Sequence, residues 1–134
     1  MSHAAARSTN LRIMIKLVYC VRKSADISQA EFHRYWLEEH GPRARKHAKA
    51  IHAIRYVQSH TLDSELNGLI RTSRSAGPPY DGITEMWWPD MGAFEKSLSS
   101  EAGIAAGMDL LEDERRFVDA EASAIFLAEE HEIF

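Results

Sequence analysis

Four short segments are rich in β-branched and aromatic residues and alternate between two faces, as β-strands do. They span residues 13–21, 54–62, 83–88 and 123–132. The first segment is mostly apolar on both faces, which predicts a strand covered on both sides. In the second segment, Tyr56, Gln58 and His60 share one face. This polar line favours the wall of a pocket over plain core.

Helical spacing begins after the first strand, where Ser28-x-x-Glu31 has the spacing of a capping box at a helix start. Phe32, Trp36 and His40 recur every fourth residue, so they lie along one helix face. An apolar stripe that ends in a titratable ring is the chain's best candidate for a site. The alternative interpretation is core packing, with a histidine that interacts well with the dipole at a helix end.

Gly41 and Pro42 predict that this helix ends there, because glycine adopts the left-handed conformation of helix ends and proline has no amide hydrogen to donate. The other helices are expected at residues 43–52, 65–73, 91–98 and 101–120. In the last of them, the expected buried stripe consists of Ile104, Met108, Leu111 and Phe117. The run of five charged residues at 112–116 is expected to form its solvent side.

The elements follow the order β-α-β, long connection, β-α-β. This order predicts the ferredoxin-like split βαβ fold of the α+β class, a four-stranded antiparallel sheet with helices on one face. Residues 12–134 are expected to form this single domain, after a flexible tail at residues 1–11. The second sheet face would remain uncovered although the strands are apolar on both faces. A second copy of the chain is the simplest cover, which predicts a homodimer in the form of a dimeric α/β barrel.

The formal net charge of −4 provides no footprint for nucleic acid, and no apolar run is long enough to span a membrane. A single cysteine, Cys20, excludes an internal disulfide, so we expect a cytoplasmic protein. The seven histidines do not form a helical zinc motif, and no glycine-rich phosphate loop or nucleophile elbow is present. Neither a metal nor a nucleotide cofactor is therefore expected.

Over nearly its whole length the chain resembles the EthD family of dimeric α/β-barrel proteins. The matching segments lie at residues 14–19, 28–42, 55–60, 80–82 and 85–88, and the Trp-x-x-x-His-x-Pro signature at Trp36, His40 and Pro42 is their most specific part. The resemblance implies a homodimer with one pocket per subunit, between sheet and helices or inside the barrel. Similar proteins include polyketide cyclases, dehydratases, anthrone-type oxygenases, muconolactone-type isomerases and haem-handling barrels, and several of them work without a metal or organic cofactor.

His40 is the first candidate for a general acid or base, since the ordinary pKa of histidine lies near neutral pH. His60 and Asp81 are the other catalytic candidates, although His60 could make a structural hydrogen bond and Asp81 precedes a turn glycine. The expected substrate-binding residues are Tyr19, Trp36, Tyr56, Tyr80, Glu85 and Trp87, with core packing as the alternative for the aromatic ones. Glu85 needs a partner if buried, and His60 or His40 would be suitable.

The leading functional hypothesis is an enzyme that acts on a small apolar cyclic or aromatic compound by histidine acid/base chemistry. Oxygenation without a cofactor, dehydration, cyclisation and isomerisation all fit this description. The alternative is a non-catalytic small-molecule-binding or stress-response barrel, because the sequence shows no complete catalytic constellation. A haem-handling barrel is the third hypothesis.

Overall fold

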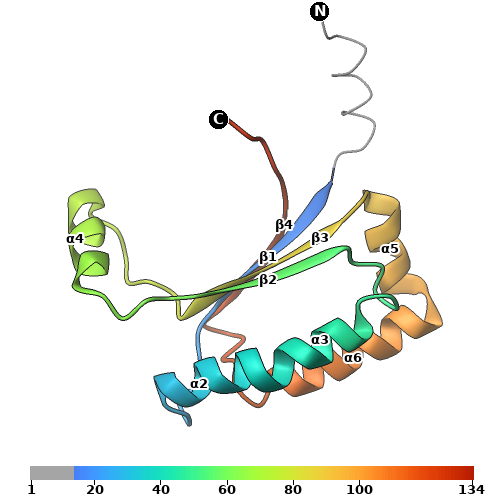
Figure 1. The fold of residues 1–134 in the computed structure, drawn as a ribbon, viewed down its shortest axis with the longest axis horizontal. Coiled ribbons are helices and arrows are strands. Elements are labelled where there is room, and N and C mark those ends of the chain that lie inside the picture. Colours follow the sequence, from blue (N-terminus) through green and yellow to red (C-terminus); the bar gives the residue numbers. More distant parts are fainter. Residues whose placement is uncertain (1–13) are drawn as a thin grey trace, which may run out of the picture.

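The computed structural model describes residues 14–134; the predicted N-terminal tail lies outside this range. A four-stranded antiparallel sheet forms the centre of the protein, with the strands in the spatial order β2-β3-β1-β4 (Figure 1). The strands are β1 (Ile15–Val21), β2 (Arg55–His60), β3 (Gly82–Trp88) and β4 (Ala124–Glu129). All four predicted strands are therefore present, and the predicted ferredoxin-like α+β fold is confirmed.

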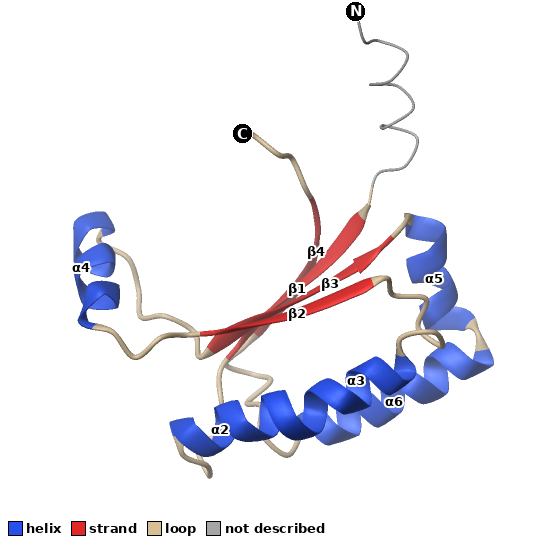
Figure 2. Cartoon of the chain, viewed as in Figure 1, coloured by secondary structure: helices blue, strands red, loops and turns tan. Residues whose placement is uncertain are grey.

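The helices, with one exception, form a layer on a single face of the sheet (Figure 2). They are α2 (Gln29–Tyr35), the π-helical turn η1 (Trp36–His40), α3 (Gly41–His47), α5 (Met91–Ser99) and α6 (Glu101–Glu114). The exception is α4 (Glu65–Arg74), which stands beyond the ends of β2 and β3 on the opposite side of the sheet (Figure 1). Among residues 14–134, no helix is long and apolar enough to pass through a membrane.

The predicted helix end at Gly41 and Pro42 is wrong, because α2, η1 and α3 form one continuous helix (Figure 1). Gly41 has right-handed dihedral angles (φ −55°, ψ −52°), and its amide donates to the carbonyl oxygen of Trp36, five residues back. This wider π turn lets the helix pass a proline, which in a regular helix would clash with the carbonyl four residues back. His40 therefore lies inside a long helix.

The strand register divides the sheet residues between two faces. Tyr19 lies opposite Thr84, and both face the helix layer, where they line a cavity with residues of α6. Cys20 lies opposite Ile83 and Val18 opposite Glu85, so these alternate residues face away from the helices. We call this second side, which no helix of the layer covers, the open sheet face.

Helix α6 buries a different stripe from the predicted one. Ile104, Met108 and Leu111 are 46–66% exposed, whereas the residues that α6 buries are Gly103, Ala106, Leu110 and Asp113. Small residues occupy the inner face because α6 packs closely on its neighbours; Ala106 belongs to the same buried cluster as Ala44 of α3. The helix also ends at Glu114, six residues before the predicted end.

Candidate functional site

A buried histidine–aspartate pair joins η1 to α6. His40 is 5% exposed, and its Nδ1 lies 2.8 Å from Oδ2 of Asp113, which is 1% exposed. The hydroxyl of Tyr35 donates to the other carboxylate oxygen of Asp113 at 2.5 Å. Burial alone would raise the pKa of Asp113, but the hydrogen bonds from Tyr35 and His40 and the charge of Arg43 lower it. Because this carboxylate is ionised, Nδ1 of His40 carries the proton and Nε2 is the basic atom.

That basic atom faces a second carboxyl group, since Nε2 of His40 lies 3.8 Å from Oε2 of Glu114. Burial, with the charge of Asp113 beside it, raises the pKa of Glu114 to about 7. Burial also lowers the pKa of His40, against the opposing effect of Asp113. Near neutral pH the pair thus holds an unprotonated imidazole next to a partly protonated carboxyl group, which is the arrangement of a general base and a general acid.

His40 and Glu114 both line a cavity of about 230 Å³ between the sheet and the helices, which we call the inner cavity. Its other lining side chains include Leu17, Tyr19, Trp36, Tyr56, Thr84, Met86, Leu110 and Phe117. The lining is mostly apolar and aromatic, and its polar side chains are the acid/base pair, the two tyrosines, Thr84 and Ser97. Burial raises the pKa of Tyr19 and of Tyr56, so both phenols keep their protons at neutral pH and can donate hydrogen bonds.

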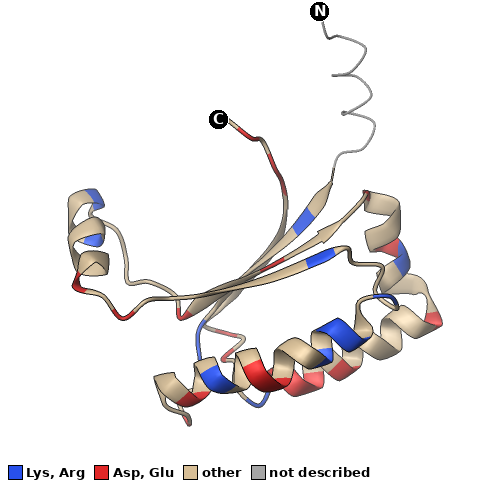
Figure 3. Cartoon of the chain, viewed as in Figure 1, with Lys and Arg blue, Asp and Glu red and all other residues tan. Residues whose placement is uncertain are grey.

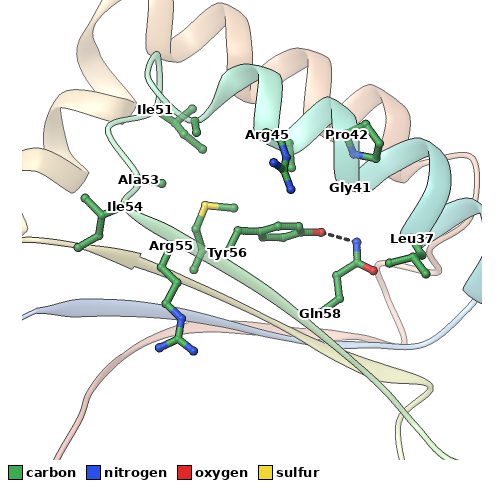
Figure 4. Close-up of a pocket in the computed structure, with 13 residues that line it drawn as sticks. Leu37, Gly41, Pro42, Arg45, Ile51, Ala53, Ile54, Arg55, Tyr56 and Gln58 are labelled. Carbon is green, nitrogen blue, oxygen red and sulfur yellow. Dashed lines mark hydrogen bonds between the residues drawn. The ribbon is translucent and has the colours of Figure 1, made fainter.

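A larger groove of about 480 Å³ lies beside the inner cavity, between α3 and the edge strand β2 (Figure 4). The two spaces share Ala44, Ile51, Tyr56 and Met86 as lining residues. In this outer groove, Gln58 Nε2 donates to the Tyr56 hydroxyl at 2.7 Å (Figure 4). The outer groove contains no pair of facing titratable groups comparable to His40 and Glu114, so we place the candidate chemistry in the inner cavity.

Comparison with known proteins identifies the family of the chain. The family model of the EthD domain matches residues 24–121, which is most of the chain. The chain belongs to the EthD family. No curated protein matches it.

Solved structures share the EthD chain's fold at low sequence identity. An EthD-family protein from Bacillus halodurans is 16% identical with a TM-score of 0.59, and the match covers 89% of this chain and all of that one. A dimeric ferredoxin-like protein from Thermobifida fusca is 12% identical (TM-score 0.56; 89% and 92% covered). SnoaB, a cofactor-independent oxygenase from Streptomyces nogalater, is 14% identical (TM-score 0.53; 90% and 95% covered). At these identities the likeness establishes the fold.

The structure of this EthD protein brings together four of the residues predicted for the site. Tyr19, Trp36, His40 and Tyr56 all line the inner cavity. They come from β1, η1 and β2, and Phe32, Trp36 and His40 do lie on one buried helix face, as predicted.

His60, Asp81 and Tyr80 lie outside the lining of the inner cavity. His60 stacks on Trp36 with ring centroids 4.5 Å apart, and its Nε2 lies 2.7 Å from Oε1 of Gln58. Asp81 accepts a hydrogen bond from the backbone amide of Lys23 at 2.8 Å, which joins the segment before β3 to the segment after β1. The guanidinium group of Arg22 lies over the ring of Tyr80, with Cζ 4.2 Å from the ring centroid. These placements favour structural roles for the three side chains.

Glu85 and Trp87 lie on the open sheet face. The predicted pairing of Glu85 with His60 or His40 is wrong, because Glu85 binds Nζ of Lys16 at 2.8 Å. The reason is the alternation of β3, which directs Glu85 and Trp87 away from the helices and Thr84 and Met86 toward them.

Sequence reasoning missed Asp113, Glu114 and Tyr35. Asp113 and Glu114 stand in the charged run at 112–116, which looks like a solvent-exposed helix face. A signal was nevertheless present: Asp113 follows Leu110 by three residues and precedes Phe117 by four, so it occupies a position of an apolar helical stripe. A carboxylate at such a position needs buried partners. Among residues 14–134, no group of three or more His, Cys, Asp or Glu side chains is arranged to hold a metal ion.

Proposed function

We propose that this EthD protein is an enzyme that transfers protons on a small apolar cyclic or aromatic compound bound in the inner cavity. His40 acts as general base and Glu114 as general acid. The observation that carries the proposal is their geometry: Nε2 of a buried, aspartate-oriented histidine lies 3.8 Å from a carboxyl oxygen with a raised pKa, in the wall of an apolar cavity.

The chemistry starts at a carbon next to a carbonyl group. Nε2 of His40 takes a proton from this carbon, and the electron pair of the broken C–H bond forms the C=C bond of an enol. Glu114 gives its proton to the carbonyl oxygen, so charge does not build up in the apolar cavity. Asp113 stabilises the resulting imidazolium through Nδ1–H and holds the ring in place.

Enolisation is a shared first step of isomerisation, dehydration and cyclisation, and it also forms the electron-rich species that cofactor-independent oxygenation requires. SnoaB, which has the same fold, is described as such an oxygenase. We therefore include oxygenation among the reaction classes. The inner cavity, at about 230 Å³, is smaller than the roughly 300–1,000 Å³ typical of sites for drug-sized ligands, which favours a compact ring system.

We also propose that the protein works as a homodimer in the cytoplasm. The open sheet face exposes apolar side chains, with Phe126 at 50% and Ile83 at 37% exposure, and the similar Thermobifida fusca protein is described as dimeric. The chain's one cysteine, Cys20, needs no oxidising compartment.

Deuterium exchange tests the catalytic proposal without knowledge of the natural substrate. We would follow the loss of α-protons from 2-tetralone and from anthrone in D₂O by NMR, for the wild type, His40→Gln and His47→Gln. The wild type should accelerate exchange, and His40→Gln should lose at least about 100-fold of this acceleration, because general-base catalysis contributes about 10²–10⁴-fold.

His47→Gln is the matched control, since His47 lies on the same helix and also pairs with an aspartate of α6. It should exchange both ketones as fast as the wild type. Equal acceleration by wild type and His40→Gln would exclude His40 as the base. Binding of the ketones with no acceleration would favour the alternative of a non-catalytic binding barrel, and a Soret band on titration with haem would favour a haem-handling one.

A further inference from the structure

Helix α4 carries an apolar stripe that nothing in residues 14–134 covers. None of its ten residues is buried. Leu66, Leu69 and Ile70 lie on one face of the helix and are 62–67% exposed, and Leu62, one turn earlier, is 76% exposed. Figure 1 shows α4 standing clear of the rest of the fold, beyond the ends of β2 and β3.

The local sequence caps this helix well but does not explain its stability. The Ser64 hydroxyl accepts from the amide of Leu66 at 3.1 Å, and Ser75 ends the helix in the left-handed conformation. Isolated helices of fewer than about 12–15 residues are nevertheless marginal in water, and Gly68 in its centre costs a further ~0.5–1 kcal/mol relative to alanine. A ten-residue helix with an exposed leucine stripe therefore requires a packing surface outside the described part of this chain.

The position of α4 indicates where that surface comes from. Helix α4, which we call the arm, stands on the side of the sheet away from α2, α3 and α6. The open sheet face points to the same side (Figure 1). The open face is itself apolar at its centre, where Val18 pairs with Phe126 and Cys20 with Ile83. A protein that covered the open face would lie next to α4, so the two uncovered surfaces form parts of one interface.

The chain itself carries the complement of α4. The last turn of the arm bears Arg71 and Arg74, and the C-terminal segment after β4, residues 130–134, contains Glu132 followed by Ile133 and Phe134 (Figure 3). Glu130 of this segment already binds Lys16 and the Trp87 indole of its own chain. Ile133 is 84% exposed and Phe134 is fully exposed. Glu132 with its apolar neighbours matches the arginine-bearing end of a helix with an apolar stripe, and this points to a second copy of the chain.

We propose that α4 is an arm that packs on the C-terminal segment of a second copy when two open sheet faces meet. Two-fold symmetry would then give two such contacts, one from each arm. The inference is independent of the proposed proton transfer, and it deepens the proposed homodimer. A dimer held by the sheet faces alone, with both arms free, is a separate outcome that the experiment below distinguishes.

Sedimentation velocity over a range of concentrations tests the arm in the full-length chain. The wild type should sediment as a dimer, and Leu66→Asp combined with Leu69→Asp should raise the dimer dissociation constant at least about 100-fold. Gly68→Asp combined with Arg71→Gln changes the net charge by the same amount on the opposite side of α4 and should leave the dissociation constant much closer to the wild-type value. Circular dichroism and thermal melting show that each variant remains folded.

A second set of variants locates the contact. Deletion of Ile133 and Phe134 should weaken the dimer as the arm variant does. The charge reversals Arg71→Glu with Arg74→Glu, and Glu132→Lys, should each weaken the dimer. In a heterodimer of the two reversed chains, every arm meets a C-terminal segment of opposite charge. A mixture of the two chains should therefore regain the dimer, as should one chain that carries all three reversals.

The native cysteine gives an independent readout. Cys20 lies on the open sheet face, so its reaction with a thiol reagent should be slow in the wild-type dimer and fast in the arm variant. A wild-type monomer, or an arm variant that dimerises like the wild type, would overturn the proposal. A dimer that survives deletion of Ile133 and Phe134 would overturn the assigned contact, and a dimer lost on removal of residues 2–13 would assign α4 to that segment.

Discussion

The protein contains two histidine–aspartate pairs between the same two helical segments, and only one of them has the geometry that the proposed proton transfer requires. His40 binds Asp113 at 2.8 Å, and His47, seven residues further along the same helix, binds Asp109 at 2.7 Å. The hydrogen bonds are equivalent in length. The surroundings differ, because the Asp113 side chain is fully buried and the Asp109 side chain is 40% exposed.

The two pairs differ in burial and in the charged or titratable group that lies beside each of them. Asp109 shares its carboxylate with Arg43 at 2.9 Å at the surface, where water and salt screen the charges. Asp113 orients His40 toward Glu114 and an apolar cavity, where both pKa values shift and electrostatic effects are strong. A histidine–aspartate hydrogen bond alone therefore does not identify a catalytic histidine.

The largest expected effect on stability separates the two aspartates. Asp113→Ala removes two hydrogen bonds to a charged group and leaves the Nδ1–H of His40 buried without a partner, so it should lower the free energy of unfolding by about 3–5 kcal/mol. Asp109→Ala removes a partly exposed pair and should cost less than about 1 kcal/mol. Urea denaturation at neutral pH measures both, and equal losses would contradict the comparison.

Glu114→Gln should produce a stability effect that depends on pH. The folded-state pKa of Glu114, about 7, lies above the ordinary value of 4.5, so the folded state holds this proton between those values and loses stability as pH rises through them. Glutamine removes this loss. The variant should be more stable than the wild type by on the order of 2 kcal/mol at pH 8 and about equally stable at pH 4. A constant difference across this range would show that Glu114 titrates normally.

Gly82→Ala should disturb the packing of β3 against the helix that carries Trp36 and His40. A Cβ at Gly82 would lie 2.8 Å from the carbonyl oxygen of Ser59 and would overlap the Trp36 ring. We expect a loss of about 1–3 kcal/mol in the free energy of unfolding. Gly68→Ala is the control, because a Cβ there meets open space and should stabilise α4 slightly. Calorimetric melting compares the two, and an unchanged Gly82→Ala protein would mean that Trp36 can move freely.

The smallest effect belongs to His47. His47→Gln should change the free energy of unfolding by less than about 0.5 kcal/mol, because its partner Asp109 keeps Arg43. Thermal melting of His47→Gln beside His40→Gln makes this measurement. A loss as large as that of His40→Gln would remove the distinction between the two pairs.

Local patterns predicted much of the fold. Alternation located the four strands, and the side chain of Ser28 caps α2 by accepting from the amide of Glu31, as its spacing indicates. The π turn escaped prediction because Gly41 and Pro42 normally end a helix, whereas the continuation depends on tertiary contacts, of Trp36 with the sheet and of His40 with α6.

The site was only half predictable for a related reason. His40, Trp36 and Tyr56 carry their own signals of aromatic or titratable side chains at periodic positions. Asp113 and Glu114 are indistinguishable in composition from their charged neighbours, and α6 has apolar residues on two faces. Which face becomes buried depends on how closely α6 can approach α3, a property of the packed structure.

The most direct test of the proposed acid/base pair is the pH dependence of ketone α-proton exchange, corrected for the rate without protein. The wild type should show a bell-shaped profile, rising below pH 6.5 as His40 loses its proton and falling near pH 7 as Glu114 loses its own. Glu114→Gln should be slower and lack the falling limb. Profiles of the same shape for the wild type and Glu114→Gln would contradict the account.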